Sequence, residues 1–369
     1  MIILWGIGNT LYNFMKTQSY NELKKQEIIL YDKYKKIDQY ESISVISNIW
    51  EKSIVECIDK IIIVSYSWQE IYSECINNQI EDKKIQIFDI SDQMLKSYYT
   101  MCYDNYTFYQ NSLMIEFKTR ENTKSQAAYK AFEKDSNIIR NARYVNIMLS
   151  NQCNYATIHK LCPASCKSAK EIMQTSLIRM IYKDLYESGF RGILQFHIYN
   201  EPMNDPRLFL LIKEAKEVLK NVTISLYTNG FYLTDDIIPD LYENGVDILT
   251  TTGYGLEEYH RLMKLNVEIP FFVLGGNLDS RLDWYESKNP VKSVDERCGC
   301  FLNSINIYSN GDIGLCCLDY KHPYGLGNVK EMRLSEIMKQ EKIIELQKEL
   351  LVGDRTRYAL CNNCGWSLY

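Results

Sequence analysis

The cysteines are the residues of this sequence with the most distinctive chemistry. Three of the 12 lie singly in the first third of the chain, where a role as a small buried hydrophobe is typical. The other nine form two groups, one between residues 153 and 166 and one between residues 298 and 364. Clustered cysteines in a reducing compartment are typical of metal sites rather than disulfides. The sequence therefore predicts two metal sites.

The composition is that of an ordinary globular protein of two or three domains. Its 369 residues are 46% hydrophobic and 24% charged, and the net charge is −5. A negative net charge gives no general reason to bind nucleic acid or an anionic membrane. The first residues lack the cationic start of a signal peptide, and no apolar run approaches the roughly 18–20 residues that span a membrane. We expect a cytoplasmic protein with no membrane span and no nucleic-acid partner.

The first group, Cys153, Cys162 and Cys166, offers three thiolates on one loop. Three thiolates can hold a [4Fe–4S] cluster and leave one iron open for a cofactor or substrate. Zinc bound by these cysteines and His159 is the alternative, although zinc knuckles usually space their ligands two to four residues apart. We favour the iron–sulfur interpretation.

The second group places Cys298 and Cys316 around a predicted β-hairpin and adds Cys361 and Cys364 from the tail. Two strands, Ser304–Tyr308 and Ile313–Cys317, flank a Ser-Asn-Gly-Asp turn. Four thiolates close a site completely, as in an electron-transfer or structural cluster. A zinc ribbon with four cysteine ligands fits the spacing equally well.

A second alternation of strands and helices, from residue 144, must position the first group. Its apolar runs predict five strands, at Val145–Leu149, Gly192–Tyr199, Val222–Tyr227, Val246–Thr250 and Val267–Leu274. The helices predicted between and after them lie at Ala169–Glu187, Arg207–Lys220, Asp235–Glu243 and Glu257–Leu265. This pattern predicts a partial (β/α)6-type barrel, whose active site forms at the carboxyl ends of the strands. Cys153, Glu201, Asn229 and Thr252 all follow or end such strands.

The rest of the chain completes an α/β protein. Residues 1–90 alternate strand and helix, with strands predicted at Ile2–Trp5, Glu27–Tyr31, Lys60–Ser65 and Lys84–Asp89, and this pattern predicts a Rossmann-like parallel sheet. Gly6-x-Gly8 after the first strand, with Asp32 further on, is compatible with a nucleotide site, but Leu11 stands at the third glycine. A bare structural turn and a nucleotide site both remain open. We assign residues 91–140 to a connector with a helix at Gln126–Lys134, residues 141–290 to the barrel, and residues 291–369 to a small domain with a hairpin and a helix at Leu334–Leu350.

The first cysteine loop resembles the cluster-binding loop of radical S-adenosylmethionine (SAM) enzymes. A strand runs into Cys153-Asn154-Tyr155, and Cys162-Pro-Ala-Ser-Cys166 follows. The family spacing is Cys-x3-Cys-x2-Cys, and Thr157 stands where the second cysteine would fall, so the loop looks like an expanded variant. The resemblance implies that Cys153, Cys162 and Cys166 hold a [4Fe–4S] cluster that binds SAM, with Tyr155 beside it.

The ends of the next strands also resemble this family. Phe196–Pro202 is similar to the Gly-Gly-Glu-Pro segment that contacts the SAM amino group, with Tyr199 and Asn200 in place of the glycines. Thr228-Asn229-Gly230 matches the third strand's ending, and Thr250–Thr252 lie where hydroxylated residues approach the ribose. The resemblance implies a SAM site and a carboxylate, Glu201, of catalytic interest. The implied cofactor-binding residues are Tyr155, Asn200, Glu201, Pro202, Thr228, Asn229, Thr251, Thr252 and Arg281. Arg281 and Asp279, just past the fifth predicted strand, are candidates for contacting either the substrate or the SAM carboxylate.

The second cysteine group resembles the auxiliary-cluster domain called SPASM. The matching segments are Arg297–Phe301, Ile307–Asp319, Gly327–Val329 and Leu334–Ile337. The one-cluster form, called twitch, fits better than the full domain. The resemblance implies a second [4Fe–4S] cluster on Cys298, Cys316, Cys361 and Cys364, with Cys300 able to replace Cys298 and Cys317 spare.

The resemblance implies an enzyme that cleaves SAM to a 5′-deoxyadenosyl radical and abstracts hydrogen from an unactivated C–H bond. A reducing flavodoxin or ferredoxin would supply the electron. The Rossmann-like front favours a sugar, nucleotide-sugar or glycan precursor that is dehydrogenated or epimerised. Modification of a peptide or protein side chain is the alternative, and a zinc-stapled nucleotide-binding module without catalysis is a second.

Overall fold

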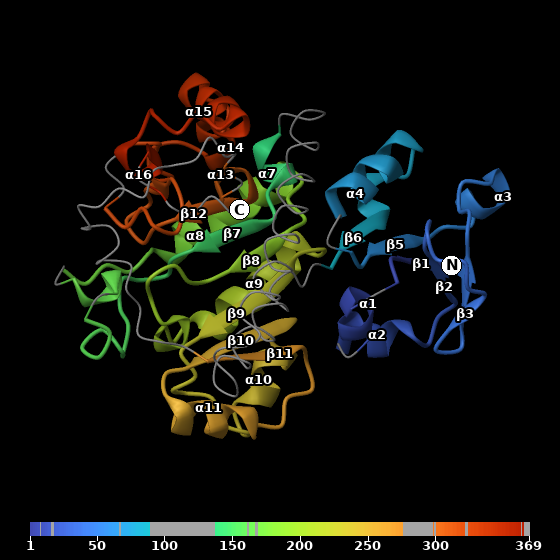
Figure 1. Cartoon of the computed structure of the whole chain (residues 1–369), viewed down its shortest axis with the longest axis horizontal. Helices are drawn as coiled ribbons and strands as arrows, with labels where there is room; N and C mark the ends of the chain where they lie inside the picture. Colours follow the sequence, from blue (N-terminus) through green and yellow to red (C-terminus); the bar gives the residue numbers. More distant parts are fainter. Residues whose placement is uncertain are drawn as a thin grey trace, which may run out of the picture.

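The computed structural model describes residues 1–88, 137–275 and 298–364, apart from short gaps at residues 8, 16–17, 66–67, 161, 167–168, 299, 322–323 and 363. Two sheets organise these residues, an N-terminal one and a larger central one (Figure 1). The predicted connector helix at Gln126–Lys134, and Asp279 and Arg281, lie outside the described residues.

The N-terminal sheet is parallel except at one edge, where β3 runs antiparallel to β4. Its strand order is β3-β4-β2-β1-β5-β6, and the five parallel strands follow the order of a doubly wound sheet. The strands are β1 (Ile2–Trp5), β2 (Ile28–Tyr31), β3 (Gln39–Tyr40), β4 (Ile43–Ile46), β5 (Lys60–Ile63) and β6 (Ile85–Ile87). The helices are α1 (Asn9–Phe14), α2 (Gln18–Leu23), α3 (Lys52–Val55) and α4 (Trp68–Asn77). The four strands predicted for this region are confirmed, whereas β3 and β4 were not predicted.

The turn after β1 is held together by Asp32. One carboxylate oxygen of Asp32 accepts a hydrogen bond from the Ile7 amide (2.9 Å), and the other accepts from the Tyr34 and Lys35 amides (2.9 and 3.0 Å). Gly6 adopts φ +117°, where a Cβ atom would lie 2.8 Å from the Val64 carbonyl oxygen. In a dinucleotide site the corresponding acid would hold a ribose. These contacts favour the structural-turn interpretation of the motif.

The central sheet has the order β11-β10-β9-β8-β7-β12-β13 and is parallel from β11 to β12. The five predicted barrel strands are all confirmed, with somewhat shorter bounds. They are β7 (Tyr144–Ile147), β8 (Ile193–Gln195), β9 (Thr223–Thr228), β10 (Ile248–Gly253) and β11 (Phe271–Gly275).

The C-terminal hairpin, β12 (Ser304–Ile307) and β13 (Ile313–Gly314), is confirmed and extends the same sheet. Strand β12 pairs in parallel with β7, in the register Ser304 to Tyr144 and Ile307 to Ile147. The Asn146 amide also donates a hydrogen bond to the Asn306 side chain at 2.8 Å. A strand of the C-terminal domain thus lies along the free edge of the partial barrel.

The helices of this half pack mainly on the outer face of the sheet. They are α7 (Ile138–Asn141), α8 (Thr175–Glu187), α9 (Leu208–Leu219), α10 (Ile238–Glu243), α11 (Leu256–Met263), α13 (Cys300–Asn303), α14 (Leu334–Ile337), α15 (Glu341–Val352) and α16 (Ala359–Asn362).

Two predicted helix boundaries in this half were wrong. The helix predicted from Ala169 begins only at Thr175, because Ile172 forms a β-bridge with Ser150. The helix predicted at Leu334–Leu350 is broken into α14 and α15, because Gln340 is extended (φ −63°, ψ 141°). In both cases apolar residues at helical spacing continued through residues that tertiary contacts hold in another conformation.

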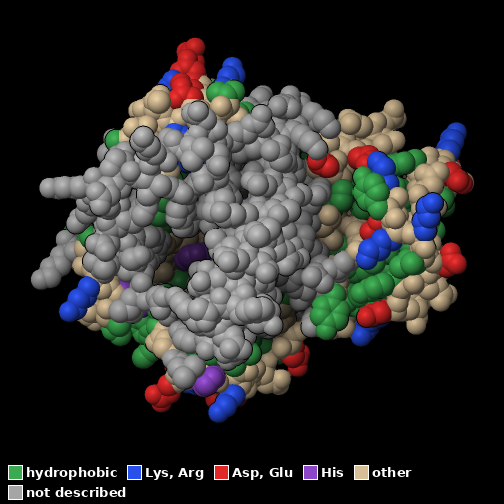
Figure 2. Space-filling view, viewed as in Figure 1, with side chains coloured by type: hydrophobic (Ala, Val, Ile, Leu, Met, Phe, Trp, Pro, Cys, Tyr) green, Lys and Arg blue, Asp and Glu red, His purple; other side chains and the backbone are tan. Residues whose placement is uncertain are grey.

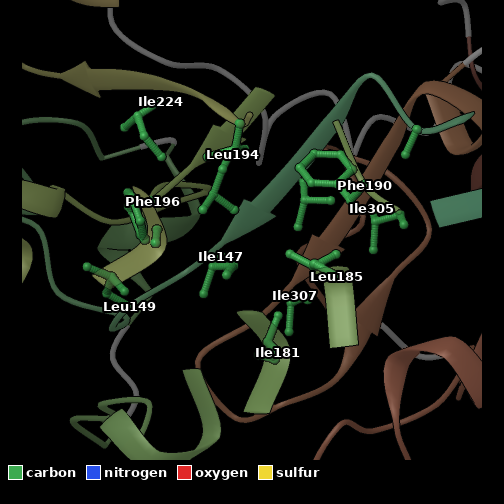
Figure 3. Packing of buried hydrophobic residues seen from close by; sticks show 14 of the residues in the cluster. Ile147, Leu149, Ile181, Leu185, Phe190, Leu194, Phe196, Ile224, Ile305 and Ile307 are labelled. Atoms are coloured by element: carbon green, nitrogen blue, oxygen red, sulfur yellow. The ribbon is translucent and has the colours of Figure 1, made fainter. Parts of the chain in front are cut away.

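The two faces of the central sheet differ in polarity. Residues at alternate positions, such as Ile147, Leu194 and Ile305, pack against Ile181 and Leu185 of α8 (Figure 3). The intervening positions carry polar side chains, of which Gln195, Ser225 and Asn306 are buried and Asn146 is partly buried. Because successive side chains alternate between the faces of a strand, these amides and hydroxyls face away from the helices. The face of the sheet that points away from these helices is therefore polar.

The N-terminal sheet contacts the central one where the barrel strands begin. Arg191, just before β8, donates to the Asp82 carboxylate at 2.6 and 3.0 Å, and Tyr72 donates to the same carboxylate at 2.5 Å. The Thr223 hydroxyl at the start of β9 donates to the Ile87 carbonyl at 3.2 Å. The loop that follows β7 lies at the other end of the strands (Figure 1). The N-terminal sheet therefore braces the barrel from the end opposite the cysteine loop.

Candidate functional site

A pocket of about 120 Å³ lies at the carboxyl ends of the central strands. The loop after β7 and the ends of β8, β9 and β10 all contribute to it. Its lining includes Cys153, Tyr155, His159, Cys162, His197, Tyr199, Asn200, Glu201, Tyr227, Thr228, Asn229, Thr252 and Tyr254. The structure thus brings together most of the residues that the sequence assigned to the SAM site.

Glu201 fastens the end of β8 to the end of β9. Its side chain is 2% exposed, and its carboxylate accepts hydrogen bonds from the Thr228 hydroxyl (2.8 Å), the Asn229 amide (2.7 Å) and the Met203 amide (3.0 Å). Burial raises the pKa of Glu201, and these three hydrogen bonds oppose that rise. A carboxylate with three partners inside the protein is suited to holding the site's shape.

Asn229 connects this network to the first cysteine. Its side-chain amide donates to Asn154 at 2.6 Å and lies 4.0 Å from the Cys153 sulfur. The Tyr155 backbone amide also points at that sulfur, at 3.4 Å. Burial raises the pKa of the Cys153 thiol, whereas the Tyr155 amide lowers it. Donors directed at a sulfur suit a thiolate that binds a metal.

The two threonines assigned on β10 face opposite sides. Thr252 lines the pocket, whereas Thr251 is fully buried beside Gly230, whose hypothetical Cβ would lie 2.5 Å from the Thr251 hydroxyl. Gly230 adopts φ +78°, which favours glycine. Thr251 therefore shapes the Thr228-Asn229-Gly230 turn from behind.

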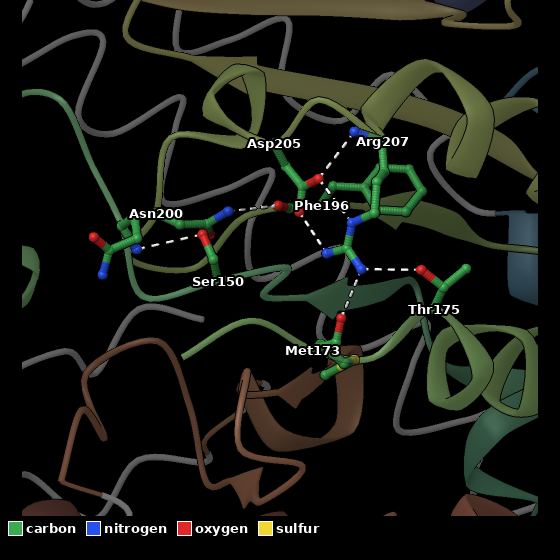
Figure 4. Close-up of polar contacts among 8 residues, drawn as sticks. Ser150, Met173, Thr175, Phe196, Asn200, Asp205 and Arg207 are labelled. Atoms are coloured by element: carbon green, nitrogen blue, oxygen red, sulfur yellow. Dashed lines mark hydrogen bonds and ion pairs between the residues drawn. The ribbon is translucent and has the colours of Figure 1, made fainter. Parts of the chain in front are cut away.

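The loop after β8 is stiffened from outside the pocket. Arg207 donates to Asp205 at 2.6 and 2.9 Å, and to the Met173 carbonyl and the Thr175 hydroxyl at 2.9 and 3.0 Å (Figure 4). The Asn200 side chain accepts from the Ile198 amide and donates to the Phe196 carbonyl, each at 3.1 Å. Pro202 begins the short 3₁₀ turn Pro202–Asn204. The segment that replaces the family's glycines is therefore a fixed turn.

The three cysteines of the first group do not all face one space. Cys153 and Cys162 line the pocket, whereas Cys166 is exposed and lines a neighbouring cavity. Within the described part of the chain, no three His, Cys, Asp or Glu side chains stand close enough to hold a metal. The donor set of three thiols on one loop fits a [4Fe–4S] cluster, and binding would require Cys166 to turn toward the other two.

The second cysteine group surrounds one small apolar pocket. All six thiols line it, from Cys298 to Cys364, together with Leu315, Leu350 and Arg355. A hydrogen bond from Cys300 lowers the pKa of Cys298, and burial raises the pKa of Cys361 to about 12. Cys300 and Cys317 thus share the pocket with the four assigned ligands.

Sequence reasoning missed Arg355 and the role of Tyr199. Arg355 is 3% exposed and lines the thiol pocket, where a cation offsets the negative charge of thiolate ligands. Two arginines, Arg355 and Arg357, stand in the short segment between helix α15 and Cys361, and a cation so close to the cysteines was a usable signal. Tyr199 lines the first pocket and donates to the Cys317 carbonyl at 2.6 Å, which no sequence pattern indicated.

The outer surface adds little to this picture. On the face in Figure 2, Lys and Arg side chains of the N-terminal part are interspersed with Asp and Glu rather than gathered in one patch. Every helix in the described ranges is too short or too polar to cross a membrane.

The C-terminal cysteines belong to a known domain. The family model SPASM, an iron–sulfur cluster-binding domain, matches residues 298–365. Since these residues carry the six thiols around one pocket, the chain is an iron–sulfur protein with a SPASM domain.

The larger part of the chain has the radical SAM fold. The crystal structure of BtrN in complex with AdoMet and 2-DOIA matches it with a TM-score of 0.52 and 22% identity, covering 61% of this chain and 93% of that chain. The S-adenosyl-L-methionine-dependent 2-deoxy-scyllo-inosamine dehydrogenase of Niallia circulans is 24% identical over 230 residues, which are 60% of this chain and 91% of the dehydrogenase. The predicted partial barrel with a SPASM domain is confirmed as the architecture.

Proposed function

We propose that the protein is a radical SAM dehydrogenase that oxidises a sugar or cyclitol. The observation that carries the proposal is the pocket at the strand ends, where Cys153, Cys162, Glu201, Asn229 and Thr252 meet in the order of the radical SAM motif. The similarity to a dehydrogenase that, by its name, acts on 2-deoxy-scyllo-inosamine supports this substrate class.

Two groups of cysteines would hold two separate clusters. Cys153, Cys162 and Cys166 would hold the cluster that binds SAM, and the SPASM thiols would hold the auxiliary cluster. When bound, these groups supply a 5′-deoxyadenosyl radical that takes a hydrogen atom from an unactivated C–H bond, and an acceptor for one electron.

The protein's own side chains must orient the substrate and receive a proton, because converting an alcohol to a ketone releases one. His197 lines the pocket and stacks on Tyr227, with ring centroids 4.7 Å apart. An imidazole titrates near neutral pH, so His197 is our candidate for the base. Glu201, with its carboxylate fully engaged, is better described as a positioning residue.

The remaining assignments are part of the same proposal. A flavodoxin or ferredoxin would deliver the electron that starts each turnover. Arg281 and Asp279 would contact SAM or substrate. The hydrogen bonds of Asp32 weigh against a nucleotide in the N-terminal domain, so we favour a free ring over a nucleotide-linked one.

Anaerobic reconstitution followed by a SAM-cleavage assay tests the proposal. We expect about eight irons per chain and transfer of deuterium from a labelled cyclitol or sugar into 5′-deoxyadenosine. Deuterium transfer only from a peptide would favour the peptide-modifying alternative. One or two zincs with no iron would refute the enzyme altogether.

A further inference from the structure

One charged side chain of the C-terminal domain is buried against the cysteines of the SPASM site. Arg355 is 3% exposed and lines the apolar pocket around which the six thiols lie. Among the described residues that line this pocket, it is the only lysine, arginine, histidine or acid. A guanidinium stays protonated at every pH that a folded protein tolerates. The site therefore carries a permanent positive charge.

The chain around Arg355 is a fixed turn that directs this one side chain inward. Helix α15 is followed by Gly353, which adopts φ +87°, and the Asp354 amide donates to the Glu349 carbonyl at 2.9 Å. The Asp354 carboxylate accepts from the Thr356 amide and hydroxyl at 3.0 and 2.7 Å. Asp354 and Thr356 are exposed, whereas Arg355 between them is buried. The turn thus keeps the arginine inside the protein and leaves the neighbouring carboxylate in solvent.

The charge of Arg355 acts on two of the four thiols assigned to the auxiliary cluster. The Cys300 hydrogen bond lowers the pKa of Cys298 against the effect of burial, and Arg355 lowers it further. Burial raises the pKa of Cys361, and Arg355 opposes that rise. These two cysteines come from opposite ends of the domain's sequence. Arg355 therefore lies where the negative charge of a cluster bound by both thiolates would gather.

A buried carboxylate, Asp319, acts in the opposite direction but more weakly. Its side chain is fully buried, and one of its oxygens accepts from the Leu315 amide at 3.0 Å. Burial and the neighbouring thiols have the largest effects on the pKa of Cys361; after them, Arg355 lowers it by more than Asp319 raises it. The cation therefore prevails over the carboxylate at this ligand.

The first pocket has the opposite local charge. Its described lining contains no lysine or arginine. Burial raises the pKa of Cys153 most, and the buried carboxylate of Glu201 raises it further. The charge of Arg261 reaches Tyr155 on the cysteine loop, but it is paired with Glu258 at 2.5 Å. A buried cation among the ligands is therefore a property of the second site.

We propose that Arg355 raises the reduction potential of the auxiliary cluster and so fits that cluster to accept an electron from the substrate. Reduction makes a cluster one charge more negative, and a cation beside it stabilises the reduced state more than the oxidised state. In the proposed oxidation, the substrate radical gives one electron to this cluster and one proton to a base as its C–O bond becomes C=O. The use of the electron rests on the proposed function, whereas the effect on the potential rests on the SPASM site alone.

Protein-film voltammetry of the anaerobically reconstituted protein measures this potential without a substrate. Solvent screens a buried charge little, so its removal should have a large effect. We expect Arg355→Gln to lower the ratio of reduced to oxidised auxiliary cluster about tenfold at the wild-type midpoint, which is about 59 mV for one electron. The potential of the first cluster should not change. Cys153→Ser, which lacks the first cluster, identifies the signal that belongs to the auxiliary cluster.

Arg357→Gln is the matched control. Arg357 is exposed, pairs with Glu345 and Glu349 at 3.0 and 2.6 Å, and is not among the residues that line the thiol pocket. The control removes the same charge from the same segment and should leave both potentials unchanged. An equal lowering by Arg355→Gln and Arg357→Gln would overturn the assignment, because the net charge of the protein would then set the potential.

Arg355→Lys tests the same charge with a side chain that can lose it. A buried lysine gives up its proton by about pH 10, whereas arginine does not. We expect the auxiliary potential of Arg355→Lys to match wild type at about pH 7 and to lie below it at about pH 10. A lysine variant that follows wild type at both pH values would contradict the proposal. So would a wild-type potential in Arg355→Gln, or loss of the auxiliary cluster from both variants, since Arg355 would then serve to hold the cluster.

The potentials separate this inference from the proposed function. If they shift as expected but no sugar or cyclitol passes deuterium to 5′-deoxyadenosine, the proposed function fails and the role of Arg355 stands. If deuterium is transferred but Arg355→Gln keeps the wild-type potential, only the role of Arg355 fails.

Discussion

Replacing Gly230 by alanine isolates the packing that shapes the turn after β9. At φ +78° any side chain strains the backbone, by about 1–3 kcal/mol. The added Cβ would also lie 2.5 Å from the Thr251 hydroxyl and 2.8 Å from a Leu262 methyl. Such overpacking costs about 1–3 kcal/mol more. We therefore expect Gly230→Ala to lower the free energy of unfolding by about 2–6 kcal/mol.

Gly255 provides the matched control. It has φ +113°, but a Cβ there would meet nothing within 4 Å. Gly255→Ala therefore carries the backbone strain without the clash, and the difference between the two variants isolates the packing cost of about 1–3 kcal/mol. Urea unfolding of both variants, at one pH and cluster loading, measures this difference.

A rescue variant tests whether the named atom is the cause. The Thr251 hydroxyl has no hydrogen-bond partner among the described residues, so Thr251→Ala alone should cost little. Combined with Gly230→Ala it should recover about 1 kcal/mol, leaving the Leu262 contact in place. Equal destabilisation by Gly230→Ala and Gly255→Ala, or no recovery in the double variant, would refute this account of the turn.

Two further predictions concern the metal sites and the domain contact. Cys153→Ser and Cys316→Ser should each lower the iron content from about eight to about four per chain, and only Cys153→Ser should abolish SAM cleavage; loss of all iron in either variant would contradict two independent sites. Burial raises the pKa of Asp82, but the Arg191 and Tyr72 hydrogen bonds outweigh it and hold that pKa below the ordinary 3.8. The stability from this contact is therefore present at neutral pH and lost as the pH falls through the lowered pKa. Asp82→Asn should cost about 1 kcal/mol at pH 7, because the carboxylate is half exposed, and nothing near pH 2 in urea unfolding; a cost independent of pH would mean that the charge is not involved.

The sequence predicted the strands that carry the site because each is a short apolar run that ends in polar or glycine residues. Cys153, Glu201 and Asn229 follow such runs, and parallel strands bring their carboxyl ends to one edge. This local regularity sufficed to gather most of the first pocket. It did not reveal β3 and β4, whose residues Gln39–Ile46 form no continuous apolar run.

The errors share one physical cause, namely contacts between residues far apart in the chain. The break before α15 and the late start of α8 could not be seen in the helical spacing of apolar residues. The direction of Cys166 and the contact of Tyr199 with Cys317 depend on how the C-terminal domain sits on the barrel. Propensity and periodicity describe neighbours in sequence, and tertiary packing overrides them.

The pairing of β12 with β7 joins the two thiol sites into one rigid unit. The loop with Cys153 follows strand β7, and the hairpin that begins with β12 leads to Cys316. The two strands are joined by backbone hydrogen bonds and by the side-chain hydrogen bond between Asn146 and Asn306. Tyr199 adds a second link, from the first pocket to the Cys317 carbonyl. Electron transfer depends steeply on distance, and a hydrogen-bonded sheet fixes that distance better than a flexible linker would. The continuous sheet is therefore the structural reason why a substrate oxidised at one site could pass its electron to the other.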